Sequence, residues 1–267
     1  MNAIDIHAHA FPDSLAERAM QKLCHAGQIE ACGDGTVAGL LASMDAAGID
    51  VAMLCPIATK PGQADGIAEW CGQVIGPRIR AVASLHPEED DPPAVLAGLA
   101  EAGFAGIKLH PQYQQFAADD QRAMVIYRAA AELGLFVVAH CGLDFAFPDT
   151  NDSAAPPRFA RVMEAVDGLV LIATHMGGWR AWDQVRDCLI GRFDGRLYLE
   201  TSFSLAQLPP EQATEMIHAH GTGRVLYGTD WPWNDQAREL ELLTGLELTE
   251  DQQAAVRWKN AADLLKL

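Results

Sequence analysis

Short apolar runs rich in β-branched residues alternate with amphipathic stretches along the whole chain. The runs cover residues 3–7, 50–55, 79–85, 106–109, 135–139, 169–174, 196–201 and 224–229. They are nearly continuous in apolar residues, which is typical of parallel strands buried on both faces. The stretches between them, such as 119–134 and 155–168, repeat apolar residues at three- and four-residue intervals and predict helices.

This alternation of strand and helix predicts one domain over residues 1–267. Eight units in 267 residues average about 33 residues each, the size of a βα unit. A (β/α)₈ TIM barrel, somewhat distorted, is therefore the expected fold, with a doubly wound open sheet as the alternative. Residues 20–36 exceed what a barrel loop requires, so we expect an extended loop after the first strand that acts as a lid or substrate loop.

In such a barrel the chemistry lies where the strands end. Five of the eight runs end in histidine and a sixth ends in aspartate; the polar residues at these ends include His7, His9, His86, Lys108, His110, His140, His175 and Asp230. Such a concentration is hard to attribute to chance. These side chains are expected to meet at the mouth of the barrel.

The first run carries two histidines on one predicted face, because Asp5, His7 and His9 have the same parity along a strand. Barrel closure would bring His7 and His9 to His140 and Asp230, and these four side chains form a candidate set of metal ligands. Three imidazoles and a carboxylate suit zinc and leave room for a water whose proton Asp230 could take. His175 would polarise a carbonyl or protonate a leaving group.

Each of these residues also has a purely structural explanation. The paired histidines could be hydrogen-bonded core residues, and Asp230 could cap the helix that follows it. His175 could likewise be structural. The choice between these explanations rests on whether the side chains converge.

Composition and charge narrow the partners. The formal charge of -17, with 19 Lys and Arg and no basic stripe, argues against binding to nucleic acid or to anionic membranes. The six cysteines form no C-x-x-C pair. The start of the chain does not resemble a signal peptide, and no apolar run reaches membrane length, so we expect a cytoplasmic protein that acts on a small molecule. Barrels of this kind often pair, so a homodimer is considered.

Five motifs resemble one known family. They are "DIHAHAFP", "GIKLHP", "VVAHCG", "ATHMGGW" and "LYGTDWPW", in this order from residue 4 to the last helix. Together they resemble the amidohydrolase superfamily, in particular the amidohydrolase-2 branch that includes aminocarboxymuconate-semialdehyde decarboxylase. The resemblance implies a TIM barrel with a metal held by His7, His9, His140 and Asp230 and with His175 as a nearby catalytic residue.

Lys108 and His110 share a predicted face and should point into the barrel, where an unpaired ammonium is costly. A carboxylated Lys108 could bridge two metals, as in urease-like members of the superfamily. The alternative, which we prefer, is that Lys108 binds a substrate carboxylate or pairs with a residue such as Asp5. The branch usually works with a single ion, so one Zn²⁺ is expected, with Mn²⁺ or a binuclear site as the alternatives.

Two reactions fit these residues. The favoured one is hydrolysis of an amide, lactone or similar carbonyl of a small substrate; the alternative is non-oxidative decarboxylation of a small unsaturated or aromatic acid. Among the loop cations, Arg180 is the best candidate for anchoring a substrate, although a surface ion pair would explain it equally. Trp179 and Trp231 are expected to line the substrate pocket. A non-catalytic barrel that keeps a metal for stability is the third hypothesis.

Overall fold

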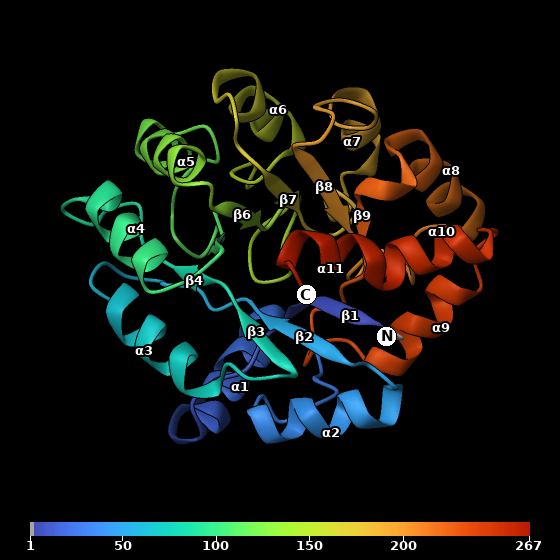
Figure 1. Cartoon of the computed structure of the whole chain (residues 1–267), viewed down its shortest axis with the longest axis horizontal. Helices are drawn as coiled ribbons and strands as arrows, with labels where there is room; N and C mark the ends of the chain where they lie inside the picture. Colours follow the sequence, from blue (N-terminus) through green and yellow to red (C-terminus); the bar gives the residue numbers. More distant parts are fainter. Residues whose placement is uncertain (1–2) are drawn as a thin grey trace.

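The computed structural model describes residues 3–267. Every strand pairing in it is parallel, and helices surround the strands (Figure 1). The strands are β1 Ile4–Ala8, β2 Val51–Leu54, β3 Ile79–Ala81, β4 Ala83–Ser84, β5 Gly106–Leu109, β6 Phe136–Ala139, β7 Leu171–Ala173, β8 Leu197–Glu200 and β9 Val225–Leu226. They follow in the order β1-β2-β3 and β4 to β9, and β3 and β4 are two halves of the predicted third strand, separated by Val82 alone.

The helices lie outside the strands. They are α1 Asp13–Gly27, α2 Val37–Ala47, α3 Ala64–Val74, α4 Pro92–Glu101, α5 Gln121–Leu133, α6 Pro156–Ala165, α7 Trp182–Cys188, α8 Pro210–His220, α9 Gln236–Thr244, α10 Glu250–Ala254 and α11 Asn260–Leu265, with short 3₁₀ and π turns at Thr222–Arg224 and Ala255–Lys259. In the part of the chain described here, no helix is long and apolar enough to cross a membrane.

The barrel closes between the last strand region and β1. The backbone amide of Ile6 donates to the carbonyl of Tyr227 at 3.0 Å, and that of Asp230 donates to the carbonyl of His7 at 2.7 Å. Farther along, His9 donates to the carbonyl of Trp231. The (β/α)₈ barrel predicted from the sequence is thus confirmed, and its closure brings residues 7–9 beside residues 230–231.

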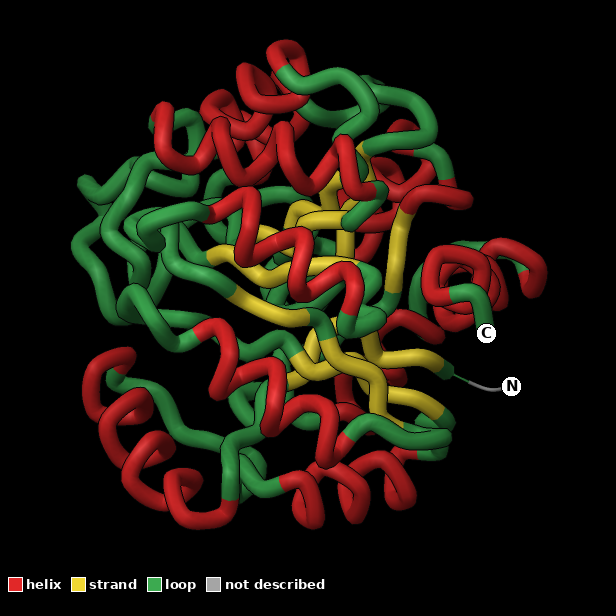
Figure 2. The backbone as a smooth tube through the Cα atoms, turned by 60° about the vertical axis from the view of Figure 1, so that its left-hand side comes forward, coloured by secondary structure: helices red, strands yellow, loops and turns green. Residues whose placement is uncertain are grey.

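A compact apolar cluster fills the barrel interior. It joins Ile4 and Ile6 of β1 to Val138 of β6 and Ile172 of β7, and Ala261 of α11 packs against it. Figure 1 shows α11 lying across the barrel beside β1. Figure 2 shows the longest loops gathered on the side of the molecule away from both termini. One end of the barrel is therefore plugged by apolar residues, which leaves the other end for a polar site.

The expectation of an extended loop over residues 20–36 is wrong for the first half of that segment. Residues 20–27 complete α1, which buries Ala16 and Met20 and ends at Gln28 in a left-handed conformation (φ 49°). Only residues 28–36 run without regular structure before α2 begins. The segment after β1 is thus largely helical.

Candidate active site

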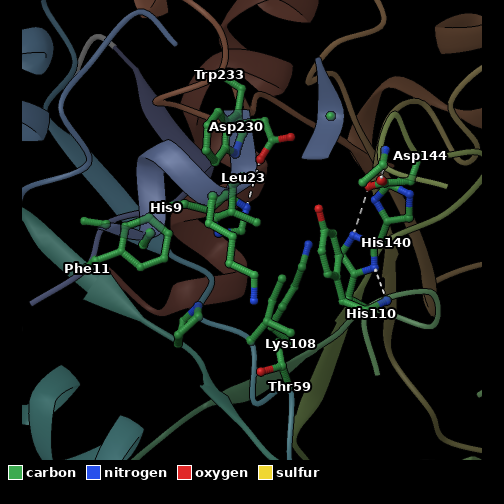
Figure 3. Close-up of a pocket in the computed structure, with 18 of the residues that line it drawn as sticks. His9, Phe11, Leu23, Thr59, Lys108, His110, His140, Asp144, Asp230 and Trp233 are labelled. Carbon is green, nitrogen blue, oxygen red and sulfur yellow. Dashed lines mark hydrogen bonds and ion pairs between the residues drawn. The ribbon is translucent and has the colours of Figure 1, made fainter. Parts of the chain in front are cut away.

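Three sequence-predicted residues converge at the carboxyl end of β1. Oδ1 of Asp230 lies 2.9 Å from Nε2 of His9 and 3.3 Å from Nε2 of His7, and the two imidazole nitrogens are 3.2 Å apart. His7 is almost fully buried, and only 8% of the surface of Asp230 is exposed. Figure 3 shows His9 and Asp230 together on one side of a cavity, with Lys108 extending toward them.

An irregularity in β1 sets the direction of these side chains. The pairing of β1 with β2 shifts register between Asp5 and Ala8, and such bulges re-aim side chains beside active sites. The expectation that Asp5 shares a face with His7 and His9 is wrong for this reason. The carboxylate of Asp5 instead accepts hydrogen bonds from Thr229 and from Gln236 of α9.

Asp230 and His175 both occupy left-handed backbone conformations, with φ values of 63° and 60°. Residues other than glycine adopt such conformations at a cost, and they concentrate at functional sites. For Asp230 this strained conformation is held by a hydrogen bond that its backbone amide donates to the carbonyl of His7. The sharp turn directs the carboxylate toward the two histidines.

Glu200, at the end of β8, fixes the orientation of His7. Its Oε1 lies 3.1 Å from Nδ1 of His7 and also accepts from the hydroxyl of Ser202 at 2.7 Å and the amide of His175 at 2.8 Å. Burial alone would raise the pKa of Glu200, but His7 and these hydrogen bonds hold it at about 2. Because the carboxylate needs a donor, Nδ1 of His7 carries the proton and its Nε2 lone pair faces the cavity. The sequence interpretation missed Glu200, although a charged residue ending the apolar run "LYLE" is the signal that marks it.

The donor atoms of His7, His9 and Asp230 fit a divalent ion. All three atoms lie within 4.8 Å of one another, and imidazole nitrogen and carboxylate oxygen are donors that a divalent ion such as zinc prefers. Oδ1 of Asp230 is buried, and it faces the other two atoms of the group, Nε2 of His9 and Nε2 of His7. The Glu200–His7 contact is the outer partner that metal-binding histidines ordinarily have.

His140 lines the same cavity but is not part of this three-residue group. Its Nδ1 lies 3.1 Å from Nε2 of His175, and its Nε2 lies 2.9 Å from the carbonyl of Leu143. Its role as a further metal ligand therefore stays a prediction. His175, in turn, contacts the hydroxyl of Ser202 through Nδ1 at 2.8 Å, so the four groups form a hydrogen-bonded chain that ends at Glu200.

His110 and Asp144 face the cavity from the side opposite His9 (Figure 3). Nε2 of His110 lies 3.4 Å from a carboxylate oxygen of Asp144. The rings of His110 and His140 stack 4.0 Å apart with planes only 8° from parallel. An imidazole binds a metal in the plane of its ring, so two stacked rings are poorly placed to share one ion. We regard His110 and Asp144 as hydrogen-bonding groups of the cavity wall.

Lys108 is fully buried and reaches the metal-binding cluster. Its Nζ lies 3.0 Å from Nε2 of His7, and burial lowers the pKa of its ammonium group. Lys108 does not pair with Asp5, because Asp5 lies on the other side of β1 and is hydrogen-bonded to Thr229 and Gln236. Lys108 instead contributes a cation beside the histidines and lines the cavity.

The cavity has a volume of about 810 Å³ and is walled mainly by apolar and aromatic side chains. Trp179 lines it, as predicted, but Trp231 does not, because its ring is buried against Gly33. Arg180 is also outside the cavity: it pairs with the exposed carboxylate of Asp149 at 3.2 Å and lies over the ring of Trp179. Arg180 thus forms a surface ion pair, which was the alternative to its anchoring a substrate.

The cations that do line the cavity, besides Lys108, are Arg18 and Lys22 of α1. The sequence interpretation singled out neither residue, although it expected the segment from residue 20 to form a lid or substrate loop over the site. The aromatic residues of the wall are Phe11, Trp70, Tyr113, Phe145, Trp179, Phe203 and Trp233.

A buried carboxyl group below the site predicts a pH dependence of stability. Burial, reinforced by the charges of Glu200 and Asp5, raises the pKa of Glu239 to about 8. An unfolded glutamate has a pKa of roughly 4.3, so its folded form favours the proton and stability falls as pH rises from about 4.3 through 8. We expect Glu239→Gln to match the parent protein at pH 4, where glutamate is protonated in both states, and to melt several degrees higher at pH 9. Melting curves with chelator present test this, and an equal difference at both pH values would contradict it.

Gly228 leaves space for Glu200. A Cβ atom at this position would overlap Oε2 of Glu200 and lie 3.1 Å from Cβ of His7. Gly228→Ala should therefore displace Glu200 and weaken divalent metal binding by roughly 10- to 100-fold, as loss of an outer partner usually does. Competition with a chromophoric chelator measures it. Gly223→Ala, whose Cβ would meet no atom within 4 Å, is the matched control and should bind metal like the parent.

The fold and the cluster define an enzyme of the barrel class whose reactive groups lie at the carboxyl ends of the strands. The family model described as amidohydrolase matches residues 4–267, and the chain belongs to that family.

Three similar proteins extend the comparison. Decarboxylase orsB of Emericella nidulans is 32% identical over 100 residues, which span 36% of this chain and 28% of that protein. The solved dihydroxybenzoic acid decarboxylase of Polaromonas sp. JS666, with bound manganese and the inhibitor 2-nitroresorcinol, matches with a TM-score of 0.72 at 17% identity, covering 100% of this chain and 98% of the other. A probable 2-pyrone-4,6-dicarboxylic acid hydrolase of Acinetobacter baumannii, with citric acid bound, gives 0.70 at 14% identity, with 100% of both chains covered.

Proposed function

We propose that this protein is a divalent-metal-dependent, non-oxidative decarboxylase of a small unsaturated or aromatic acid. One observation carries the proposal: the His7, His9 and Asp230 cluster opens into a cavity whose wall is mostly apolar and aromatic. A cation site at the end of an apolar pocket suits an acid with a planar hydrocarbon body. This replaces hydrolysis, the reaction favoured by the sequence interpretation, as the first candidate.

The side chains that line the cavity would form the environment of the substrate acid. Aromatic rings such as Trp179 and Phe203 would hold a planar body and exclude water, and a carboxylate in apolar surroundings loses the hydration that stabilises it. A divalent ion held by His7, His9 and Asp230 would supply a Lewis acid that holds the substrate and takes up negative charge as the carbon–carbon bond breaks.

Loss of carbon dioxide leaves an electron pair on carbon that must receive one proton. The chain from Ser202 through His175 to His140 reaches the cavity and can hold that proton between Nε2 of His175 and Nδ1 of His140. Burial lowers the pKa of both rings, so each is neutral at pH 7 and able to accept as well as donate. The net reaction exchanges a carboxylate for hydrogen and releases carbon dioxide.

The similar proteins support the same choice. The curated relative and the manganese-containing barrel are both named as decarboxylases, and the second is named for an aromatic acid. Manganese or zinc are the metals to supply first, since nitrogen and carboxylate donors suit both.

The test is turnover of hydroxybenzoates and unsaturated acids by manganese- or zinc-loaded protein, followed by product mass in ordinary and heavy water. Decarboxylation gives a product lighter by carbon dioxide that carries one solvent deuterium on carbon. A product heavier by one water would support hydrolysis instead. Release of carbon dioxide from none of the acids, with or without metal, would contradict the proposal.

Hydrolysis is the second candidate because the same cluster is suited to activating water. Asp230 is close enough to both histidines to accept a proton from a water bound among them, and the Acinetobacter baumannii protein is named as a hydrolase. Lactones of small dicarboxylic acids are the substrates to test for this reaction.

A further inference from the structure

One face of α1 forms a wall of the cavity. Its lining residues recur at three- and four-residue intervals, as expected for a single helical face: Leu15, Arg18, Ala19, Lys22 and Leu23. Leu15 is 43% exposed, and Phe145, which also lines the cavity, is 44% exposed. The exposure of these two large apolar side chains places this face at the open rim of the cavity, away from the buried cluster.

Arg18 and Lys22 are cations without a partner. Within residues 3–267 neither forms an ion pair or a hydrogen bond, although the chain carries 36 acidic residues against 19 basic ones. By contrast, eight arginines pair with carboxylates: Arg78, Arg122, Arg158, Arg161, Arg180, Arg186, Arg192 and Arg224. The two unpaired cations are also four residues apart on one helix, a spacing at which like charges repel and destabilise the helix.

The cavity therefore has cationic groups in two places. One is Lys108 at the buried end, beside the residues that would hold a divalent ion, and the other is the α1 wall. Apolar residues such as Phe11, Leu23 and Trp233 also line the space that these groups share (Figure 3). A ligand with a single carboxylate would leave one of the two cationic regions unused.

We propose that Arg18 and Lys22 bind a second anionic group of the substrate, so that the substrate class is a small apolar dicarboxylic acid. This inference rests on the proposed function, which places the reaction at the buried end of the cavity. It adds that the substrate carries a second carboxylate, which lies at the rim. Arginine and lysine bind carboxylates through charge-assisted hydrogen bonds, which are stronger than neutral ones. The two residues determine which acid binds and take no part in the bond that breaks.

The test compares binding of benzoate, isophthalate and terephthalate, which share an aromatic body and differ in carboxylate number and position. Trp70, Trp179 and Trp233 line the cavity, so quenching of tryptophan fluorescence reports occupancy of the full-length protein, with and without added manganese. We expect at least one diacid to bind about tenfold or more tightly than benzoate. In the Arg18→Gln/Lys22→Gln variant that preference should disappear while benzoate affinity changes little.

A matched control separates direct contact from net charge. Arg128→Gln/Lys266→Gln removes the same two positive charges from exposed positions that do not line the cavity, and it should keep the preference for the diacid. The inference is overturned if the α1 variant keeps the preference, if the control also loses it, or if the parent protein binds no diacid better than benzoate. Binding is measured without turnover, so a preference for the diacid that depends on Arg18 and Lys22 would leave this inference standing even if no acid tested released carbon dioxide and the proposed reaction failed.

Discussion

Replacement of Asp230 by asparagine is expected to lower kcat/KM by a factor of about 10³ or more while the barrel stays folded. The side chain keeps its size, so the packing around residue 230 is preserved. What it loses is the negative charge that faces the imidazoles of His7 and His9 at 3.3 and 2.9 Å. Burial alone would raise the pKa of Asp230, but the surrounding histidines, His7 first, hold it well below its usual range, so the parent residue is charged at neutral pH.

The measurement combines turnover, metal content and a melting curve for the parent and the variant. Asp149→Asn, at an exposed carboxylate outside the cavity, makes the same chemical change as a control and should behave like the parent. If Asp230→Asn retained full turnover and only melted earlier, the metal would have a structural role. That result would favour the hypothesis of a non-catalytic barrel.

The sequence predicted the barrel and the residues at its strand ends because both depend on local patterns. Apolar runs about 33 residues apart identify the βα units, and a parallel barrel gathers all carboxyl ends of its strands at one mouth. The structure brings His7, His9 and Asp230 together as expected, whereas His140, the fourth predicted ligand, lies beside His175 instead. The parity argument for Asp5 failed because the pairing of β1 shifts register, and a bulge leaves no reliable mark in a five-residue run.

The wall of the site was harder to predict because it depends on packing between distant segments. Nothing local to Arg180 indicates that Asp149 lies beside it, and nothing local to Trp231 indicates that Gly33 leaves room for its ring. Arg18 was overlooked for the same reason. It lines the cavity because one face of α1 forms a wall of that cavity, which no pattern within the helix reveals.

Lys108 competes with a metal ion, because both would contact the lone pair on Nε2 of His7. Nδ1 of His7 is engaged by Glu200, so Nε2 is the only nitrogen of that ring free to bind a metal, and it lies 3.0 Å from Nζ of Lys108. Metal binding must break that contact and bring a divalent cation close to an ammonium group. The repulsion between two such charges at short range in a buried site is large.

We therefore expect Lys108→Met to bind manganese or zinc about tenfold or more tightly than the parent, because the variant keeps a buried chain of similar length without the charge. Chelator competition measures the affinity, and elemental analysis gives the number of ions per chain. Lys60→Met, at an exposed lysine outside the cavity, is the control and should leave the affinity unchanged. A carboxylated Lys108 that bridges two ions predicts the opposite result. In that case the parent would hold two ions, and Lys108→Met would lose at least one and bind the other more weakly.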